Sequence, residues 1–382
     1  MKGPRRICIL TGKRGGMGAL FSVLECGYAD PKLEIHVIAT DMHVSAKFGE
    51  TIRELKEYVA NPHSVPMDQT DDTPIARVRA LGKGLAGIGE ALSSIEPDIF
   101  LVLGDRGEVL AAVIAAVHLG IPVAHIQGGD ISGNIDEPMR HAITKLSHIH
   151  FPATEASAQR IMKMGEEPWR IHVVGDPHID FIVQRRFTSG SQVRKKYQLG
   201  SEPFLITLIH PETDHIDGNR SLAEAVLSTV AKFGLKTLVI YPCSDHGYQG
   251  IIDAISTFEK HSDFSIYRNV EAVDFWGLLS EATVFVGNSS AGLIEAPYFN
   301  LPVVNVGWRQ NGRDRCRNVI DCGRTPEAIE KGLTRALEPQ FREGLAERPD
   351  LKFGDGHAGE RILEVLKWVE LGQTLLVKRM TY

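Results

Sequence analysis

The sequence predicts two α/β domains in series, and three observations carry this prediction. The chain has 382 residues, more than one hydrophobic core usually organises. Short apolar runs alternate with segments of helical periodicity along both halves of the chain. Many of those runs end in polar, glycine-containing loops, as strands do at the βα junctions of doubly wound parallel sheets.

The clearest βαβ unit lies in the middle of the first half. The apolar run Ile99–Leu103 breaks into Gly104–Glu108, and a helical segment follows from Val109 to Leu119. A second apolar run, Val123–Ile126, breaks into Gln127–Asp130. Both loops carry acids and glycines at the carboxyl ends of predicted parallel strands, where such folds place their chemistry. We therefore expect an active site at these two loops.

Other segments of the first half complete a doubly wound domain. We expect strands at Ile7–Leu10, Leu33–Ala39, His148–Phe151 and Arg170–Val174, helices at Ala19–Tyr28, Ala46–Val59 and Ile75–Ser94, and a surface loop at Asn61–Asp72. The loop Gly12–Gly18 is rich in glycine but matches neither GxGxxG nor the P-loop spacing. A tight turn and a ligand loop are about equally expected there, and Arg14 favours ligand binding.

Two polar features of this half have competing interpretations. Asp136 begins a helical segment, and it either caps that helix or faces the active site as a catalytic acid. His148 and His150 alternate on one strand face, as metal ligands can, but no third ligand is evident in the sequence. We therefore expect no metal site.

A second α/β series begins after the polar passage Thr188–Ser201, which we expect to connect the domains. Strands are expected at Phe204–Ile209, Thr237–Tyr241, Phe264–Tyr267 and Ala282–Val286, and helices at Ser221–Phe233, Ile251–His261, Val273–Glu281 and Gly359–Val369. The last of these strands runs into Gly287–Gly292, where Ser289 and Ser290 precede a short helix. Backbone N–H groups and hydroxyls at such a junction favour an anion site over a plain serine cap.

Composition limits the classes of function. A hydrophobic content of 43% with 24% charged residues is typical of globular proteins. The formal net charge of −6 gives no reason to expect a nucleic acid as partner. The five cysteines are scattered without metal-ligand spacing, and no apolar run approaches the roughly 20 residues of a membrane span. These features predict a cytoplasmic protein that does not bind membranes.

Four motifs occur together in this chain: GDRGE (104–108), HIQGGDISGNIDEPMRHAITKLSHIHF (125–151), HP (210–211) and GNSSAGLIEAP (287–297). In order and spacing they resemble the hydrolysing UDP-N-acetylglucosamine 2-epimerases of sialic-acid and related nonulosonate pathways. The resemblance implies an α/β fold of the glycosyltransferase-B type, two Rossmann-like domains with a central cleft for the nucleotide sugar. It also implies an enzyme without a metal or redox cofactor that converts UDP-GlcNAc and water to N-acetylmannosamine and UDP.

The resemblance also assigns individual residues. On the sugar side it implies catalytic roles for Asp105, Arg106, Gln127, Asp130, Asp136, Asp180 and His210. For UDP it implies contacts from Arg14, His210, Ser289, Ser290, Gly292, Glu295 and Arg313, with the serines on the pyrophosphate and the glutamate on the ribose hydroxyls. The implied reaction needs such groups, because the C2 proton requires a positioned base and the departing diphosphate requires hydrogen-bond donors.

Three positions depart from the family pattern. The family's first loop commonly has an acid where this chain has Gly16 and a lysine where it has Ala19. Gln127 stands where several relatives have an acid or a histidine. These changes affect the sugar side, so a 2,4-diacetamido-2,4,6-trideoxy sugar nucleotide is a second possible substrate for the same reaction. A glycosyltransferase of the same fold and a non-catalytic nucleotide-sugar sensor are also compatible with the motifs.

The resemblance and the strand pattern together suggest how the chain is divided. We expect a first domain at 1–185 with the catalytic acids, a nucleotide-binding domain at 186–358, and a terminal helix within 359–382 that packs back on the first domain. The expected ligand is a nucleotide sugar, and the expected assembly is a homodimer or homotetramer.

Overall fold

The computed structural model describes residues 3–12, 14–45, 51–71, 73–132, 135–213, 215–243, 245–348 and 350–382, apart from the side chains of Arg14, Gly15 and Glu54. The chain forms two compact units. Unit 1 contains residues 1–130, 135–184 and 353–382, and unit 2 contains residues 131–134 and 185–352. The chain therefore returns to unit 1 after it has completed unit 2.

The sheet of unit 1 has six parallel strands in its described residues, in the order β3-β2-β1-β4-β5-β6. These are β1 (Arg5–Thr11), β2 (Leu33–Thr40), β3 (His63–Val65), β4 (Ile99–Leu103), β5 (Val123–Ile126) and β6 (Ile149–Phe151). The central strands are buried on both faces, which is why they read as continuous apolar runs and not as alternating ones.

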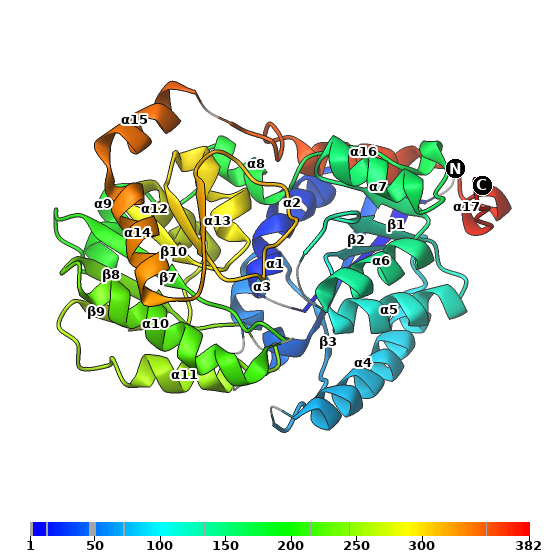
Figure 1. Cartoon of the computed structure of the whole chain (residues 1–382). Helices are drawn as coiled ribbons and strands as arrows, with labels where there is room; N and C mark the ends of the chain where they lie inside the picture. Colours follow the sequence, from blue (N-terminus) through cyan, green and yellow to red (C-terminus); the bar gives the residue numbers. More distant parts are fainter. Residues whose placement is uncertain are drawn as a thin grey trace. The chain divides into compact units, whose positions relative to one another are not determined.

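Helices cover both faces of this sheet (Figure 1). They are α1 (Arg14–Met17), α2 (Phe21–Ala29), α3 (Ile52–Tyr58), α4 (Pro74–Ile95), α5 (Gly107–His118), α6 (Asp136–Leu146), α7 (Glu155–Lys163), α8 (His178–Val183), α16 (Ala358–Trp368) and α17 (Gln373–Leu376). Helix α4 begins with proline at a tolerated first-turn position, behind a Thr73 hydroxyl that accepts from Ala76 N at 3.3 Å. Ile88 and Leu92 of α4 pack with Phe100 of β4 and Val113 of α5 in one core cluster.

Unit 2 repeats this architecture. Its six parallel strands have the order β12-β11-β10-β7-β8-β9. They are β7 (Phe204–Leu208), β8 (Lys236–Ile240), β9 (Phe264–Tyr267), β10 (Val284–Gly287), β11 (Val303–Val306) and β12 (Val319–Cys322). The helices are α9 (Gly190–Lys196), α10 (Asn219–Ala231), α11 (Tyr248–Ser256), α12 (Ala272–Glu281), α13 (Ala291–Ile294), α14 (Pro326–Leu337) and α15 (Pro339–Glu347).

The strand orders identify both units as Rossmann-like. In each unit the first and fourth strands are adjacent at the centre and the order reverses between them, which creates the switch point where such sheets bind ligands. The predicted fold class is thereby confirmed.

The carboxyl-terminal helix belongs to unit 1. Helix α16 lies against α2, far from it in sequence and close to it in Figure 1. Gly27 of α2 permits close packing of α2 on the sheet, since an added Cβ would lie 2.9 Å from Ile35 of β2, whereas its distance of 3.8 Å to Leu363 of α16 would be an ordinary contact. Lys367 Nζ donates to Asp30 Oδ2 at 2.8 Å at the other end of the same interface.

Several predicted elements were wrong. Residues 170–174 form no strand of their own, since Ile171 makes only an isolated bridge to His150. The predicted loop 61–72 contains the short strand β3, and the predicted connection 188–201 contains helix α9. Of the predicted helix 46–59, residues 46–50 lie outside the described residues, and α3 occupies only Ile52–Tyr58.

Candidate active site

Asp105 lies at the carboxyl end of β4, in the position that the βαβ pattern predicted. Gly104 turns the chain there with a φ of +85°, a left-handed conformation that favours glycine. The Asp105 carboxylate accepts from Arg140 Nη2 of α6, and Arg140 is 1% exposed. Arg140 Nη1 also donates to the Asp130 carbonyl at 2.9 Å. One buried guanidinium therefore joins the loop after β4 to the loop after β5.

Asp136 is the first residue of α6, so the predicted helix start is confirmed. Ile135 occupies the capping position and makes no side-chain hydrogen bond to the helix. Burial acts to lower the pKa of Arg140, but the charges of Asp105, Asp130 and Asp136 outweigh it and raise that pKa. Asp136 therefore lies within the electrostatic field of the Asp105–Arg140 pair, where its second interpretation, a catalytic acid, remains a prediction.

Arg106 belongs to a buried ionic cluster at the neighbouring strand ends. Its Nε donates to Glu108 Oε1 at 2.9 Å, and its Nη2 lies 3.7 Å from Asp41 Oδ2. Arg77 Nη2 of α4 donates to the other oxygen of Glu108 at 2.6 Å. Burial and the charge of Glu108 raise the pKa of Asp41 to about 6 against the opposing effect of the two arginines. The cluster holds Arg106 in a fixed position and places an acid of raised pKa beside it.

Gln127 and Asp130 follow β5 with different partners. Gln127 has a φ of +63°, and its Nε2 donates to Asp176 Oδ2 at 2.6 Å. Asp130 is 8% exposed and accepts from Ser157 Oγ at 2.6 Å through its carboxylate. Gly129 between them has a φ of +82°, and a Cβ there would lie 2.3 Å from the Ser157 carbonyl. The loop after β5 is thus locked against α7.

Asp180 has a set of partners that favours a structural role. It is 1% exposed, and its oxygens accept from the backbone N–H groups of Ala358 at 2.9 Å and Gly359 at 2.7 Å, the first residues of α16. Ser22 Oγ of α2 donates to Oδ2 at 2.7 Å. Burial raises the pKa of Asp180 in spite of these donors. The carboxylate therefore lies at the amino end of α16, where its negative charge interacts favourably with the helix dipole.

In unit 2, His210 follows β7 and is held by its backbone. Its N–H donates to Asn288 Oδ1 at 2.7 Å, and Asn288 Nδ2 donates back to its carbonyl at 2.9 Å. Nδ1 of His210 accepts from the Cys243 N–H at 3.1 Å, so the proton of the neutral ring lies on Nε2. The side chain is half-buried, and it presents an imidazole at the carboxyl edge of the second sheet.

The serine loop follows β10 at the same edge. Gly287 must be glycine, because a Cβ there would lie 2.0 Å from the Leu208 carbonyl. Ser289 is 6% exposed and its hydroxyl accepts weakly from Ala291 N at 3.4 Å. Ser290 occupies the cap position of α13 without a capping hydrogen bond from its hydroxyl. Gly292 packs tightly, since a Cβ there would lie 2.8 Å from Val303 Cγ1.

The remaining predicted UDP contacts have mixed outcomes. Glu295 is 9% exposed, and its Oε2 accepts from the Trp276 indole at 2.6 Å, which fixes the carboxylate at the end of α13. Arg313 lies in the loop after β11, where its N–H donates to the Gln310 carbonyl at 3.2 Å. Arg14 begins α1, but its side chain lies outside the described residues.

The family model described as UDP-N-acetylglucosamine 2-epimerase matches residues 27–367 of this chain. The chain belongs to this family. A UDP-N,N'-diacetylbacillosamine 2-epimerase (hydrolyzing) of Legionella pneumophila is 37% identical over 99% of this chain and 100% of its own length. A UDP-N-acetylglucosamine 2-epimerase of Neisseria meningitidis is 32% identical over 83% of each chain.

Solved structures of the family share the fold. UDP-GlcNAc 2-epimerase from Neisseria meningitidis bound to UDP-GlcNAc has a TM-score of 0.79 at 19% identity, over 94% of this chain and 99% of that one. The Methanocaldococcus jannaschii enzyme in complex with UDP-GlcNAc and UDP has a TM-score of 0.80 at 20% identity, over 95% and 100%. The predicted family is confirmed, and with it the coarser prediction of a UDP-sugar 2-epimerase. The roles of single residues stay predictions.

Sequence reasoning missed the partners of the predicted residues. Arg140 lies within the motif at 125–151, but only its spatial pairing with Asp105 shows its importance. Asp41 and Arg77 come from distant segments and carry no motif signal. Asn288 and Asp176 lie in polar loops that follow apolar runs, and that position was the available signal.

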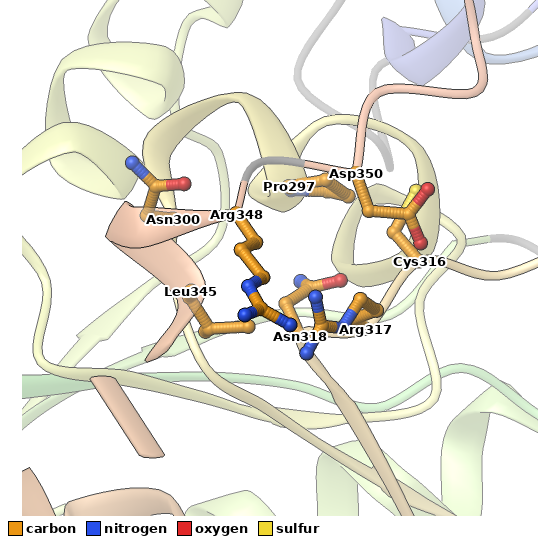
Figure 2. Close-up of a pocket in the computed structure, with 8 residues that line it drawn as sticks. All are labelled: Pro297, Asn300, Cys316, Arg317, Asn318, Leu345, Arg348 and Asp350. Carbon is orange, nitrogen blue, oxygen red and sulfur yellow. The ribbon is translucent and has the colours of Figure 1, made fainter. Parts of the chain in front are cut away.

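A pocket in unit 2 lies elsewhere (Figure 2). Asn300 and Asn318, which line it, precede β11 and β12, so the pocket is at the amino edge of the sheet. His210 and Ser289 follow the carboxyl ends of β7 and β10. The pocket therefore lies at the opposite edge of the sheet from His210 and Ser289, although Asn318 Nδ2 donates to the carbonyl of Gly292 at 3.3 Å.

Two negative findings hold for the described part of the chain. No three His, Cys, Asp or Glu side chains gather there in a way that could hold a metal ion. His150 is instead paired with Glu166 at 3.0 Å, and His148 Nδ1 accepts from the Val123 N–H at 3.0 Å. None of the helices described combines the length and apolarity needed to cross a bilayer.

Proposed function

We propose that the chain is a hydrolysing 2-epimerase acting on a UDP-2,4-diacetamido-2,4,6-trideoxyhexose, with UDP and the free 2-epimeric sugar as products. The observation that carries this proposal is the full-length similarity, at 37% identity, to the Legionella enzyme named for the hydrolysing reaction on a diacetylbacillosamine nucleotide. UDP-GlcNAc, with N-acetylmannosamine as product, is the second candidate, favoured by the 32% identical Neisseria relative.

The first loop supports the choice of a less polar sugar. Gly16 and Ala19 stand where the family motif has an acid and a lysine, and both are buried here. Neither offers a side-chain donor or acceptor to a sugar hydroxyl. A 6-deoxy sugar bears a methyl group where a hexose bears a hydroxymethyl group. It therefore has no C6 hydroxyl that would lose a hydrogen-bond partner when Gly16 and Ala19 replace the acid and the lysine.

The proposed reaction has two steps that need different groups. In the first, a base takes the C2 proton, the C2–H electrons form the C1–C2 double bond, and UDP leaves from C1 with the electrons of the C1–O bond. In the second, water adds its oxygen to C1 and loses a proton, while an acid returns a proton to C2 on the opposite face. Asp105 and Asp136 of unit 1 are the proposed candidates for the base that takes the C2 proton.

The nucleotide is assigned to unit 2 in this proposal. A departing diphosphate is stabilised by fixed N–H and O–H donors, and the Ser289–Ser290 loop and the Nε2–H of His210 supply both kinds. Glu295, fixed by the Trp276 indole, can accept from the ribose hydroxyls. The proposal thus assigns catalysis to unit 1 and nucleotide binding to unit 2, as the sequence analysis expected for the two domains.

Incubation with each nucleotide sugar, followed by NMR of UDP and of the free sugar, tests the proposal. We expect turnover of the diacetamido substrate to exceed that of UDP-GlcNAc, and product formed in D₂O to carry deuterium at C2. A preference for UDP-GlcNAc would select the second candidate. Transfer of the sugar to an acceptor would indicate a glycosyltransferase, and binding without turnover would indicate a sensor.

A further inference from the structure

The loop Gly175–His178 lies at the same edge of unit 1 as the candidate acids. Residues before it run beside β6: His172 N donates to the His150 carbonyl at 2.9 Å, and Val174 N donates to the Pro152 carbonyl at 3.3 Å. The loop therefore follows the carboxyl end of a parallel segment, as the loops after β4 and β5 do.

Asp176 is the centre of this loop. It is 1% exposed and accepts three hydrogen bonds: from Gln127 Nε2 at 2.6 Å, from His178 N at 3.0 Å and from His178 Nδ1 at 2.8 Å. Burial acts to raise the pKa of Asp176, but His178 and the other donors outweigh it and the pKa is lowered. A buried, ionised carboxylate thus faces one imidazole.

This contact determines the chemistry of His178. An ionised carboxylate only accepts, so Nδ1 of His178 carries a proton, and Nε2 is the ring nitrogen that does not contact Asp176. The carboxylate also stabilises the imidazolium form, as the aspartate does in a serine-protease triad. The side chain is 12% exposed, so it is oriented by its partner and is not fully enclosed.

The surrounding backbone holds the arrangement rigidly. Gln127 stays in its left-handed conformation, which is strained for a residue other than glycine. Its N–H donates to the Phe151 carbonyl at 3.0 Å, and its side chain binds Asp176. The Asp176 N–H donates to the Phe353 carbonyl at 2.6 Å. The strained backbone of Gln127 thus lies beside a buried carboxylate, Asp176, that orients the imidazole of His178. Functional sites often combine these two features.

We propose that His178 is a catalytic residue, the acid that returns a proton to C2 of the sugar, and that Asp176 and Gln127 are its positioning residues. The inference rests on the proposed 2-epimerase reaction. In the addition step, the Nε2–H bond of the imidazolium breaks and its proton bonds to C2, while the water oxygen bonds to C1. The water proton then restores the imidazolium, directly or through solvent.

The test is His178→Asn, because the asparagine Nδ2 can replace Nδ1 as donor to Asp176 but cannot titrate. We expect sugar formation to fall by about 10²–10⁴. Elimination does not need His178, so UDP release should continue and the 1,2-unsaturated sugar should accumulate in the NMR spectrum. UDP affinity by calorimetry and the melting temperature should match wild type. His178→Gln is the second variant if the asparagine protein does not fold.

His118→Asn is the matched control, since His118 is exposed at the carboxyl end of α5. This substitution should leave every measured quantity unchanged. Wild-type sugar formation in His178→Asn would overturn the inference. So would equal losses of UDP release and sugar formation without the unsaturated intermediate. A wild-type protein that releases neither UDP nor sugar from both nucleotide sugars would instead overturn the proposed function, and this inference with it.

Discussion

The two units share one topology but differ at their carboxyl edges. In unit 1 the edge carries buried ion pairs, Asp105 with Arg140 and Glu108 with Arg77. In unit 2 the corresponding loops also carry ion pairs, Glu212 with Arg324 and Asp245 with Arg309. They add neutral groups, with Asn288 and His210 in reciprocal hydrogen bonds and Ser290 at the start of a short helix. Topology fixes where the loops meet, and side chains decide their chemistry. Removing the charge of Asp105 should therefore affect both reaction and stability, whereas removing the hydroxyl of Ser290 should mainly affect nucleotide affinity.

The largest effect is expected from Asp105→Asn. Loss of the charge removes a candidate base, so turnover should fall by about 10²–10⁴. It also leaves Arg140 as a buried charge without its partner, which should lower the free energy of unfolding by about 3 kcal/mol. Steady-state kinetics and urea denaturation measure the two effects, and UDP affinity should stay unchanged.

Asp136→Asn separates these two consequences. Asp136 is half-buried and lies in the first helical turn but not at the cap, so the cap interpretation is wrong. Asparagine loses only the favourable interaction of the charge with the helix dipole, so the free energy of unfolding should fall by no more than about 1 kcal/mol. If Asp136 exchanges the C2 proton, the rate falls with little change in stability. Wild-type rates in both variants would show that neither acid takes part in the reaction.

Acidification should distinguish the units. Burial lowers the pKa of His125 to about 3 and those of His148 and His150 to about 4, all in unit 1. These rings are neutral in the fold but bind protons when unfolded, so stability is complete above about pH 6.5 and is lost as the pH falls toward 4. Asp41 opposes this, because its raised pKa lets the folded state bind a proton below about pH 6.

The net loss should be on the order of 5 kcal/mol between pH 7 and pH 4.5. Hydrogen exchange at stepwise lower pH should show protection lost first in the strands of unit 1, β5 and β6, and later in β7 and β10. Simultaneous loss in both units, or earlier loss in unit 2, would contradict this distinction.

Asp180→Asn should lower the free energy of unfolding by about 2–3 kcal/mol, since a charged acceptor loses hydrogen bonds from the amino end of α16. Turnover per folded molecule should stay the same. Asp30→Asn is the matched control, because it also removes a link between α2 and α16, but a less buried one with a single side-chain donor that should matter less. A large loss of rate without loss of stability would restore Asp180 to the catalytic acids.

Asp180 illustrates what the sequence could and could not predict. Asp105 and Asp180 both follow an apolar run in the sequence, but only the run before Asp105 forms a strand, β4, because residues 170–174 make a single isolated bridge. The strands that were predicted correctly are buried apolar runs. A further difference between the two acids lies in α16, which follows Asp180 178 residues later and takes both carboxylate oxygens. Strands β11 and β12 were not predicted, although β5, β9 and β10 are equally short and were predicted. Long-range partners leave no trace in local sequence.

The smallest effect is expected from Ser290→Ala in unit 2. The hydroxyl of Ser290 does not cap α13, so its removal should leave stability unchanged. If it donates to the diphosphate, one charge-assisted hydrogen bond is lost, about 1.5 kcal/mol or roughly tenfold in UDP affinity by calorimetry. Ser228→Ala, exposed on α10, is the control and should change neither. Equal UDP affinity in both variants would place the diphosphate on other groups of unit 2, and a fall in stability would make the hydroxyl a structural group after all. A tenfold loss in affinity with normal stability would be the reverse of the result expected for Asp180→Asn, and would support a role of the Ser290 hydroxyl in nucleotide binding.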